Sequence, residues 1–152
     1  MTESLDRRIL LALAASSGAS LNDLAATLEV PASTLHQRIK RLETRGLIKG
    51  YRALLDQQAV GLKLHALISL TPIDPARPDD IAEAVAAIEQ IESCWSVAGT
   101  ESYVVKVAVA DTLELESLVA KIRSAANVST RTTVILSTPF EGRQADIPRN
   151  NP

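Results

Sequence analysis

The chain has 152 residues, of which 46% are hydrophobic and only 3% aromatic. That length allows one mid-sized domain or two small ones, and the apolar content excludes a disordered chain. Charge is divided unevenly, because residues 1–55 hold eight Lys/Arg and five Asp/Glu, whereas residues 56–152 hold eight Lys/Arg and thirteen Asp/Glu. A basic first part and an acidic second part indicate two modules with different partners.

The sequence shows no sign of a membrane or exported protein. No apolar run approaches the roughly 18–20 residues that span a bilayer. The segment Met1–Asp6 has no basic stretch followed by an apolar one, so we expect no signal peptide. Cys94 is the single cysteine, which excludes an internal disulfide framework, and we expect a cytoplasmic protein.

Apolar residues at helical spacing predict two helices in the first thirty residues. The first covers about residues 4–16 and ends before Gly18. Ser20 and Asp23 then have the spacing of a helix start, in which the Ser20 side chain caps the helix and Asp23 lies near its positive end. The second apolar pattern stops at Glu29, which predicts a short second helix.

A third helix follows, and it carries the strongest functional signal. Pro31 is tolerated in a first helical turn and is expected to open this helix, which Gly46 ends. Its apolar stripe consists of Leu35, Ile39 and Leu42. The DNA-contact candidates, which lie largely outside that stripe, are Ser33, Thr34, His36, Gln37, Arg38, Lys40, Arg41 and Arg45.

A basic helix of this kind fits the major groove of B-DNA. Between His36 and Arg52 the chain holds six Lys/Arg and one acid, Glu43. Because the first residues of a recognition helix usually face bases, base or groove contact is assigned to Ser33, Thr34, Gln37 and Arg38, and mainly phosphate contact to Lys40, Arg41 and Arg45. The alternative is a solvated helix face, in which Arg38 pairs with Glu43 or Asp6.

Residues 47–62 are expected to connect the helices to a second domain. Within them, residues 47–54 can form a strand and Gly61 marks a break. From Lys63 apolar side chains alternate with others, which predicts a strand over residues 63–71. A stiff loop is then expected at Pro72, Pro75 and Pro78.

The rest of the chain completes an α+β fold. Helices are predicted at about 79–90 and from Asp111 or Thr112, and strands at about 92–98, 102–110 and 128–137. With the strand before them, these elements have the order β-α-β-β-α-β of a ferredoxin-like arrangement. The expected segments are a helix-turn-helix domain at 1–50, a hinge strand or linker at 51–62, a ligand-sensing and oligomerisation domain at 63–138 and a C-terminal tail at 139–152.

The turn between the two central strands is a candidate small-molecule site. Gly99 permits backbone conformations closed to other residues and exposes N–H groups that suit a carboxylate. Glu101 and Ser102 could accept hydrogen bonds from an ammonium group, and Arg131 on the last strand could bind a carboxylate. The candidate effector residues are Ala98, Gly99, Thr100, Glu101, Ser102, Thr130 and Thr132, with Thr133 beside them. The alternative is an ordinary hairpin with an exposed Arg131.

Several runs of the sequence resemble the Lrp/AsnC family, the feast/famine or leucine-responsive transcriptional regulators. The likeness covers nearly all of residues 4–138. The runs that carry it are Asp6–Leu10, Leu24–Ala25, Leu35–Glu43, Gly46–Tyr51, Gly99–Tyr103 and Val104–Val107.

The resemblance implies both an architecture and a function. It implies a winged or plain helix-turn-helix joined by a hinge strand to an amino-acid-binding αβ-sandwich domain of the RAM type, which dimerises through its sheets and often builds octamers. The implied ligands are double-stranded DNA and an amino-acid effector, with no cofactor. The chain departs from the family pattern at Gly18, where Arg is common, at Pro31, where a Ser cap is usual, and at Ser102, where Asp is common.

No constellation of catalytic or metal-binding residues is visible. His36 and His65 are far apart and Cys94 has no partner, so no metal-ligand spacing exists. We therefore predict a non-enzymatic, sequence-specific transcriptional regulator that acts as a homodimer, and the resemblance implies an octamer. The alternative is a small-molecule-binding module whose basic helix contacts RNA or protein; an enzyme is disfavoured for lack of acid, base or nucleophile.

Overall fold

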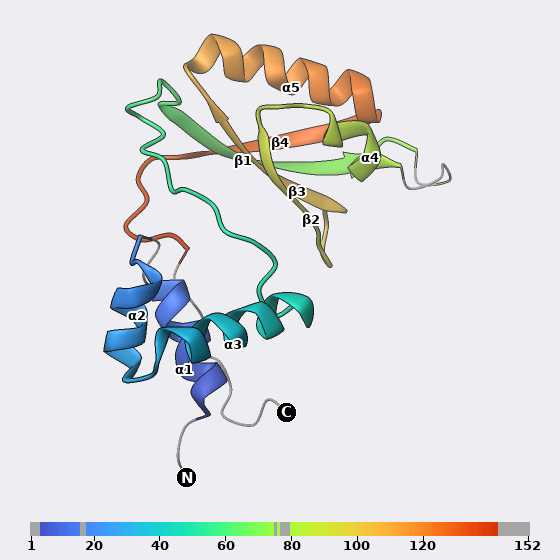
Figure 1. Cartoon of the computed structure of the whole chain (residues 1–152). Coiled ribbons are helices and arrows are strands. Elements are labelled where there is room, and N and C mark those ends of the chain that lie inside the picture. Colours follow the sequence, from blue (N-terminus) through green and yellow to red (C-terminus); the bar gives the residue numbers. More distant parts are fainter. Residues whose placement is uncertain (1–3, 16–17, 75, 77–79, 143–152) are drawn as a thin grey trace. The chain divides into compact units, whose positions relative to one another are not determined.

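The computed structural model describes residues 4–15, 18–74, 76 and 80–142 (Figure 1). The chain divides into two compact units. One contains the described residues up to Leu54 together with the segment that begins at Phe140, and the other contains Leu55–Pro139. Residues 143–152 of the expected C-terminal tail, and Pro75 and Pro78 of the expected proline loop, lie outside the described residues.

The first unit is built on three helices, as the apolar spacing predicts. They are α1 (Leu5–Ala15), α2 (Leu21–Leu28) and α3 (Ala32–Thr44). Their apolar faces meet in one core, whose buried residues are Ile9, Leu24, Ala25, Leu28, Leu35, Ile39 and Leu42. The stripe predicted for the third helix is therefore the side of α3 that packs against the other two.

Two helix starts show how local sequence sets the boundaries. The Ser20 side chain accepts a hydrogen bond from the Asp23 N–H (3.2 Å) and Asp23 accepts one from the Ser20 N–H (3.3 Å), which forms a reciprocal capping box. Pro31 stands at the N-cap of α3 instead of inside its first turn, and its side chain makes no capping hydrogen bond.

The strand expected within residues 47–54 is absent from the described chain. The Leu47 and Ile48 N–H groups donate to the Leu42 carbonyl (3.0 and 3.3 Å), so the start of this segment caps the end of α3. Gly46, with φ of 72°, makes that reversal of the chain possible. The following residues have no neighbouring strand with which to pair, and Leu54 is 74% exposed.

The second unit has the predicted β-α-β-β-α-β order. Its elements are β1 (Leu64–Pro72), α4 (Ile81–Ala86), β2 (Ile91–Ser96), β3 (Tyr103–Val109), α5 (Thr112–Ala126) and β4 (Val128–Ile135). The four strands form an antiparallel sheet in the order β2-β3-β1-β4. This arrangement confirms the α+β, ferredoxin-like prediction.

Of the two helices of this unit, α4 ends earlier than expected and α5 starts where one of the two expected starts lies. Helix α4 has six residues and stops at Ala86, because Ala87 already has non-helical backbone angles; the start expected at residue 79 lies outside the described residues. Of the two starts left open for α5, Asp111 is the N-cap, since its carboxylate accepts hydrogen bonds from Leu113 and Glu114 N–H (both 2.9 Å).

Within this unit the described helices α4 and α5 cover one face of the sheet, and no described helix of the same unit covers the other face (Figure 1). In β1, Ala66, Ile68 and Leu70 are fully buried in the core formed with α4 and α5. The residues between them, such as Leu67 and Ser69, lie on the opposite face, as alternation along a strand requires. No helix among the described residues is long and apolar enough to cross a membrane.

Candidate nucleic-acid interface and effector loop

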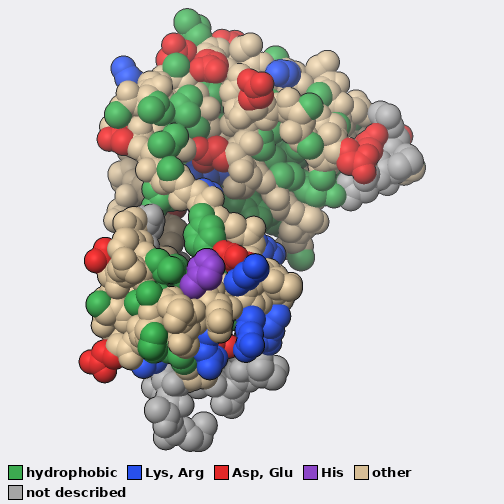
Figure 2. All heavy atoms as spheres, viewed as in Figure 1, with side chains coloured by type: hydrophobic (Ala, Val, Ile, Leu, Met, Phe, Trp, Pro, Cys, Tyr) green, Lys and Arg blue, Asp and Glu red, His purple; other side chains and the backbone are tan. Residues whose placement is uncertain are grey.

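The exposed side of α3 gathers the predicted DNA-contact residues. Thr34 and Arg38 are half-buried, and the other six are exposed: Ser33, His36, Gln37, Lys40, Arg41 and Arg45. This exposure follows from the helix itself, because Leu35, Ile39 and Leu42 use the opposite side for the core. Figure 2 shows Lys and Arg side chains gathered on the surface of the helical unit.

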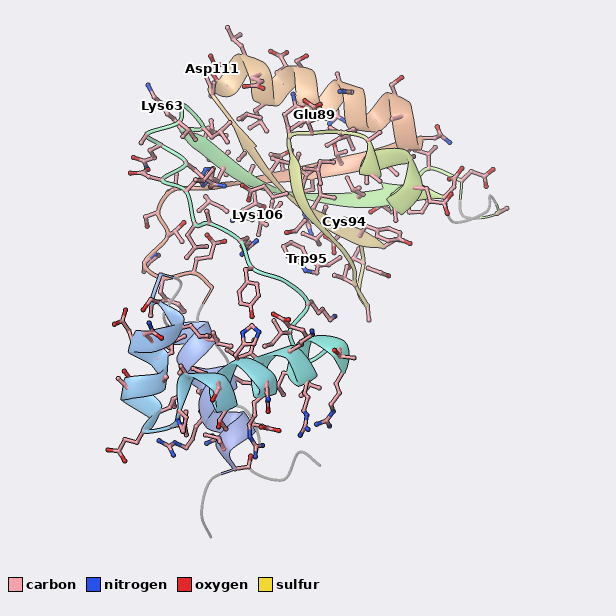
Figure 3. The ribbon with its side chains drawn as sticks, in the orientation of Figure 1. Lys63, Glu89, Cys94, Trp95, Lys106 and Asp111 are labelled. Carbon is pink, nitrogen blue, oxygen red and sulfur yellow. The ribbon has the colours of Figure 1, made fainter. Side chains whose placement is uncertain are left out.

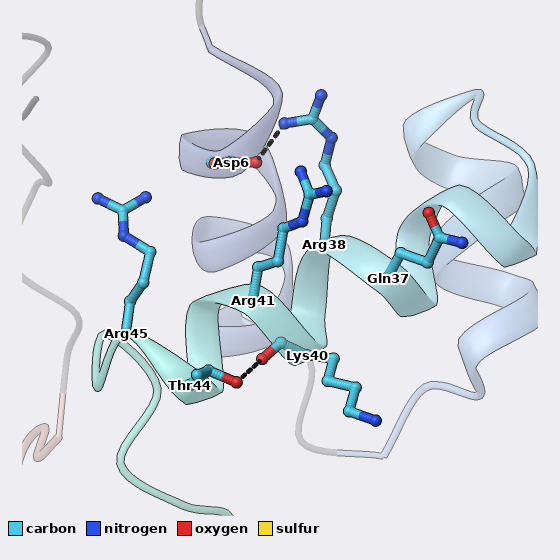
Figure 4. A pocket seen from close by; sticks show the side chains of 7 residues that line it. All are labelled: Asp6, Gln37, Arg38, Lys40, Arg41, Thr44 and Arg45. Atoms are coloured by element: carbon cyan, nitrogen blue, oxygen red, sulfur yellow. Dashed lines mark hydrogen bonds and ion pairs between the residues drawn. The ribbon is translucent and has the colours of Figure 1, made fainter.

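A groove of about 620 Å³ runs along this side of the helix (Figure 4). Its lining residues are Asp6, Gln37, Arg38, Lys40, Arg41, Thr44 and Arg45. Four of these side chains are cations and one is a carboxylate. In the described part of the chain, the side chains of Lys40, Arg41 and Arg45 make no hydrogen bond or ion pair, so their donors face solvent. Such a surface suits a polyanion.

Arg38 differs from the other three cations because a carboxylate holds it. Its Nη1 donates to Asp6 Oδ1 of α1 at 2.8 Å, and the two side chains are 41% and 36% exposed. Of the two partners that the sequence left open, Asp6 is therefore the one that Arg38 takes. Glu43 instead accepts a hydrogen bond from the Tyr51 hydroxyl (2.9 Å).

The flank of α3 away from Asp6 has a smaller hollow of about 340 Å³, lined by His36, Ile39, Lys40 and Glu43. The Tyr51 hydroxyl lies against this flank through its hydrogen bond to Glu43. Burial raises the pKa of the Tyr51 hydroxyl above its ordinary value, and the hydrogen bond to Glu43 and the charge of Glu43 raise it further. Nothing in the sequence pattern indicated that Tyr51 returns to the helix, because that contact depends on the course of the connector.

The effector loop joins β2 to β3 at residues 97–102. The Val97 N–H donates to the Ser102 carbonyl (3.0 Å) and the Ser102 N–H donates to the Leu70 carbonyl (3.0 Å), which ties the base of the loop to the sheet. Ala98, Gly99 and Thr100 at the tip are exposed. Their position leaves the tip accessible to a ligand or to another chain.

Gly99 does not serve the backbone role expected of it. Its φ lies outside the left-handed region, and a Cβ placed on it would meet no atom within 4 Å. The fold of this chain therefore has room for a side chain at this position. A requirement for glycine here would have to come from something that approaches the loop from outside.

The carboxylate at the loop already has a cationic partner. Glu101 forms an ion pair with Arg131 of β4, and the two side chains are 18% and 73% exposed. Arg131 was considered as a carboxylate ligand from the sequence, and the structure brings it to Glu101. The pair places one negative and one positive group side by side, which is the charge pattern complementary to a free amino acid.

The threonines of β4 lie elsewhere. Thr130 and Thr132 are opposite Leu70 and Ile68, so they share the helix-covered face of the sheet, whereas Arg131 lies on the other face. Thr130 Oγ1 accepts a hydrogen bond from Arg123 Nε of α5 at 2.7 Å. Within one chain, the seven candidate effector residues therefore do not line a single cavity.

The open face of the sheet carries both apolar and charged groups (Figure 3). Trp95 is 47% exposed there, and Lys106 Nζ lies 3.2 Å from Glu92 Oε2. Glu92 also accepts a hydrogen bond from Gln57. The His65 Nε2 atom is buried and has no hydrogen-bond partner among the described residues.

The described residues do not form a metal site, since no three His, Cys, Asp or Glu side chains among them come together. Cys94 is exposed overall, and partial burial raises the pKa of its thiol above the ordinary value. A thiol with a raised pKa forms less of the reactive thiolate at neutral pH.

Two family models match the chain. Residues 3–49 match a model for winged helix-turn-helix DNA-binding domains, and residues 65–145 match a model for the Lrp/AsnC ligand-binding domain. The chain is also 44% identical over 142 residues to the HTH-type transcriptional regulator LrpA of Mycobacterium tuberculosis, which covers 93% of this chain and 95% of that protein.

Solved structures have the same fold. The crystal structure of the M. tuberculosis leucine response regulatory protein LrpA matches with a TM-score of 0.83 at 42% identity, covering 96% of this chain and all of that one (100%). A feast or famine regulatory protein from M. tuberculosis, complexed with L-methionine, matches with a TM-score of 0.90 at 44% identity, covering 94% of this chain and 97% of that one.

Proposed function

This chain belongs to the Lrp/AsnC family of helix-turn-helix transcriptional regulators, and on that premise we propose that it binds operator DNA through the exposed side of α3 and responds to an amino acid at the loop between β2 and β3. The observation that carries the first part is the row of Lys40, Arg41 and Arg45, which have no carboxylate partner in the described chain. The functions proposed are binding functions, carried out in the cytoplasm.

The side chains of α3 support separate roles in DNA binding, with some contacting phosphates and others contacting bases. Lys40, Arg41 and Arg45 neutralise phosphates and release counterions, which makes the affinity depend on salt. Gln37 has an amide that can donate to and accept from the edge of an adenine in the major groove. Ser33 and Thr34 belong to the first turn of α3, so they lie near the DNA major groove as well. His36 lies on the flank of α3.

Two observations support an amino-acid effector. The Glu101–Arg131 pair offers a carboxylate for an ammonium group and a guanidinium for a carboxylate. A relative that is 44% identical has been solved with L-methionine. Because Thr130 and Thr132 do not reach Glu101 within one chain, we propose that a complete site needs a second chain, which fits an effector bound at oligomer interfaces.

A salt titration tests the DNA-binding proposal. The probe is the duplex that the wild-type protein enriches from a randomised pool, compared with a scrambled duplex of the same composition. Lys40→Ala should weaken binding to both duplexes by a similar factor and lower the slope of log affinity against log salt by about one. Lys121→Ala, on an exposed position of α5, removes the same charge from the other unit and is expected to leave the slope unchanged.

The same titration separates the two functions considered from the sequence. Sequence-selective, salt-dependent binding to duplex DNA supports the proposed function. Equal affinity for the enriched and the scrambled duplex, or tighter binding to single-stranded RNA of the same sequence, would instead favour the small-molecule-binding module whose basic helix contacts RNA or protein.

A further inference from the structure

We propose that Asp6 is a positioning residue for DNA recognition: it holds Arg38 at the flank of α3, so that Arg38 meets the phosphate backbone and base reading is left to Gln37 and its outward-facing neighbours. This inference rests on the proposed DNA-binding role of α3. It differs from the assignment made on sequence alone, which placed Arg38 with the base-contacting residues.

The first support is the geometry of the ion pair. Asp6 lies in the first turn of α1, and its Oδ1 accepts a hydrogen bond from Arg38 Nη1 at 2.8 Å. The two helices share a core in which Ile9 and Leu35 are both fully buried, so the backbones that carry the pair are held together. Asp6 therefore restrains Arg38 more than a mobile surface carboxylate would.

The second support is the direction of each side chain around α3. Successive residues of a helix are separated by about 100°, so Arg38 lies about 60° from the buried Leu35, whereas Gln37 lies nearly opposite it, at about 160°. Figure 4 shows Arg38 extending towards Asp6 of α1, while Gln37 and Lys40 point away from that carboxylate. The outermost position of the helix thus belongs to Gln37, and Arg38 lies at its side.

The third support is the electrostatics of the groove. Asp6 is the one carboxylate among the described residues that lines the groove on the protein, and its pairing with Arg38 makes that pair neutral. Bidentate contact with a guanine uses two N–H donors of one guanidinium, and Asp6 holds that of Arg38 at the flank of α3, away from the outermost side of the helix. A guanidinium has five N–H donors, so Arg38 can keep its bond to Asp6 and still donate to a phosphate beside the major groove of the DNA.

The consequence concerns selectivity. Without Asp6, Arg38 becomes a free cation on a flexible side chain, able to contact any duplex. Asp6 therefore lowers binding to non-operator DNA more than it lowers binding to the operator.

The test compares Asp6→Asn with the wild-type protein on the enriched and scrambled duplexes over a range of salt concentrations. We expect affinity for the scrambled duplex to rise about tenfold, the strength of one charge-assisted hydrogen bond. The salt slope should become steeper by about one. Glu29→Gln removes the same charge from an exposed position of the same unit and should change neither quantity.

Two further variants show whether Asp6 acts through Arg38. Arg38→Gln should lower the affinity for the enriched and the scrambled duplex by the same factor. It should leave the preferred base at every operator position unchanged. In the double variant Asp6→Asn/Arg38→Gln, the gain on the scrambled duplex should disappear, because there is no arginine to release. If the gain persists there, Asp6 acts by simple repulsion and the proposal is wrong.

The failures of the two proposals can be told apart. A wild-type protein that prefers no duplex contradicts the DNA-binding role itself. A wild-type protein that prefers its enriched duplex, combined with an Asp6→Asn variant that behaves like Glu29→Gln, contradicts only the positioning role. If thermal unfolding shows that Asp6→Asn is not folded, Arg38→Gln alone decides the matter, since a changed base preference at one operator position would assign Arg38 to base reading.

Discussion

Gly99 and Glu101 lie two residues apart in the effector loop, yet their surroundings differ sharply. Gly99 has open space where its side chain would be, while Glu101 is largely buried against Arg131. A substitution at Gly99 therefore reports what approaches the loop from outside. A substitution at Glu101 reports what its carboxylate holds.

Gly99→Val and Glu101→Gln should each weaken amino-acid binding, the first by blocking approach to the loop and the second by removing a partner of the ammonium group. One lost charge-assisted bond corresponds to a roughly ten- to hundredfold loss of affinity. Calorimetry with L-methionine as the first probe, followed by the other amino acids in a thermal-shift screen, measures this loss.

Affinity for DNA without the amino acid should stay the same in both variants. Glu116→Gln, on an exposed position of α5, is the matched control for the lost charge. Undiminished amino-acid binding by both loop variants would move the site elsewhere. Loss of DNA binding would show that the loop serves mainly in assembly.

The residue identities of the candidate sites were readable from the sequence, but the pairing of their side chains was not. Helical spacing placed Arg38 on a polar side, yet it could not decide between Asp6 and Glu43, because the choice depends on how α1 packs against α3. The sequence analysis grouped Thr130 and Arg131 at one site. The register of β4 on β1 and the ion pair with Glu101 show that Arg131 faces the effector loop and Thr130 does not.

At the level of elements, the best-predicted feature is the start of α2. A reciprocal capping box needs only Ser20, Asp23 and the helix that follows, so it is written in four consecutive residues. The strand expected within residues 47–54 is wrong for the opposite reason. A strand needs a partner, and local sequence cannot say whether one is present.

Ser20→Ala should destabilise the protein by about 1 kcal/mol, because the N–H of Asp23 loses its acceptor at the start of α2. The control is Asn22→Ala, at an exposed position of α2 two residues after Ser20. It should be neutral or slightly stabilising, because alanine has the higher helix propensity. Urea unfolding of the full chain, followed by circular dichroism, compares the two variants. Equal midpoints for both would show that the capping box adds nothing to stability.

For the whole molecule, the open face of the sheet is the main unexplained surface. Trp95 is 47% exposed on it, and the buried His65 Nε2 lacks a partner in the described chain. Large apolar groups on a face without a covering helix favour association with another chain. We therefore expect at least a dimer, whose interface is formed mainly by residues 63–138.

Light scattering at micromolar concentration should show that dimer. Trp95→Asp should raise the dissociation constant of the dimer about tenfold or more, because a tryptophan that becomes buried in an interface is often a main contributor to binding. Leu113→Asp is the control, since Leu113 is 75% exposed on α5, on the helical side of the sheet. A monomeric wild-type protein would exclude the dimer. Equal effects of the two variants would place the interface elsewhere.

The open surroundings of Gly99 also bear on how such a regulator changes its ligand over time. Residues 98–100 are exposed, and a side chain at Gly99 would displace nothing in the fold. Ligand binding therefore limits which substitutions this tip accepts, whereas folding hardly limits them. A gene in which these three codons are randomised should yield proteins that are nearly all folded, so that a new effector can be selected without first repairing the scaffold.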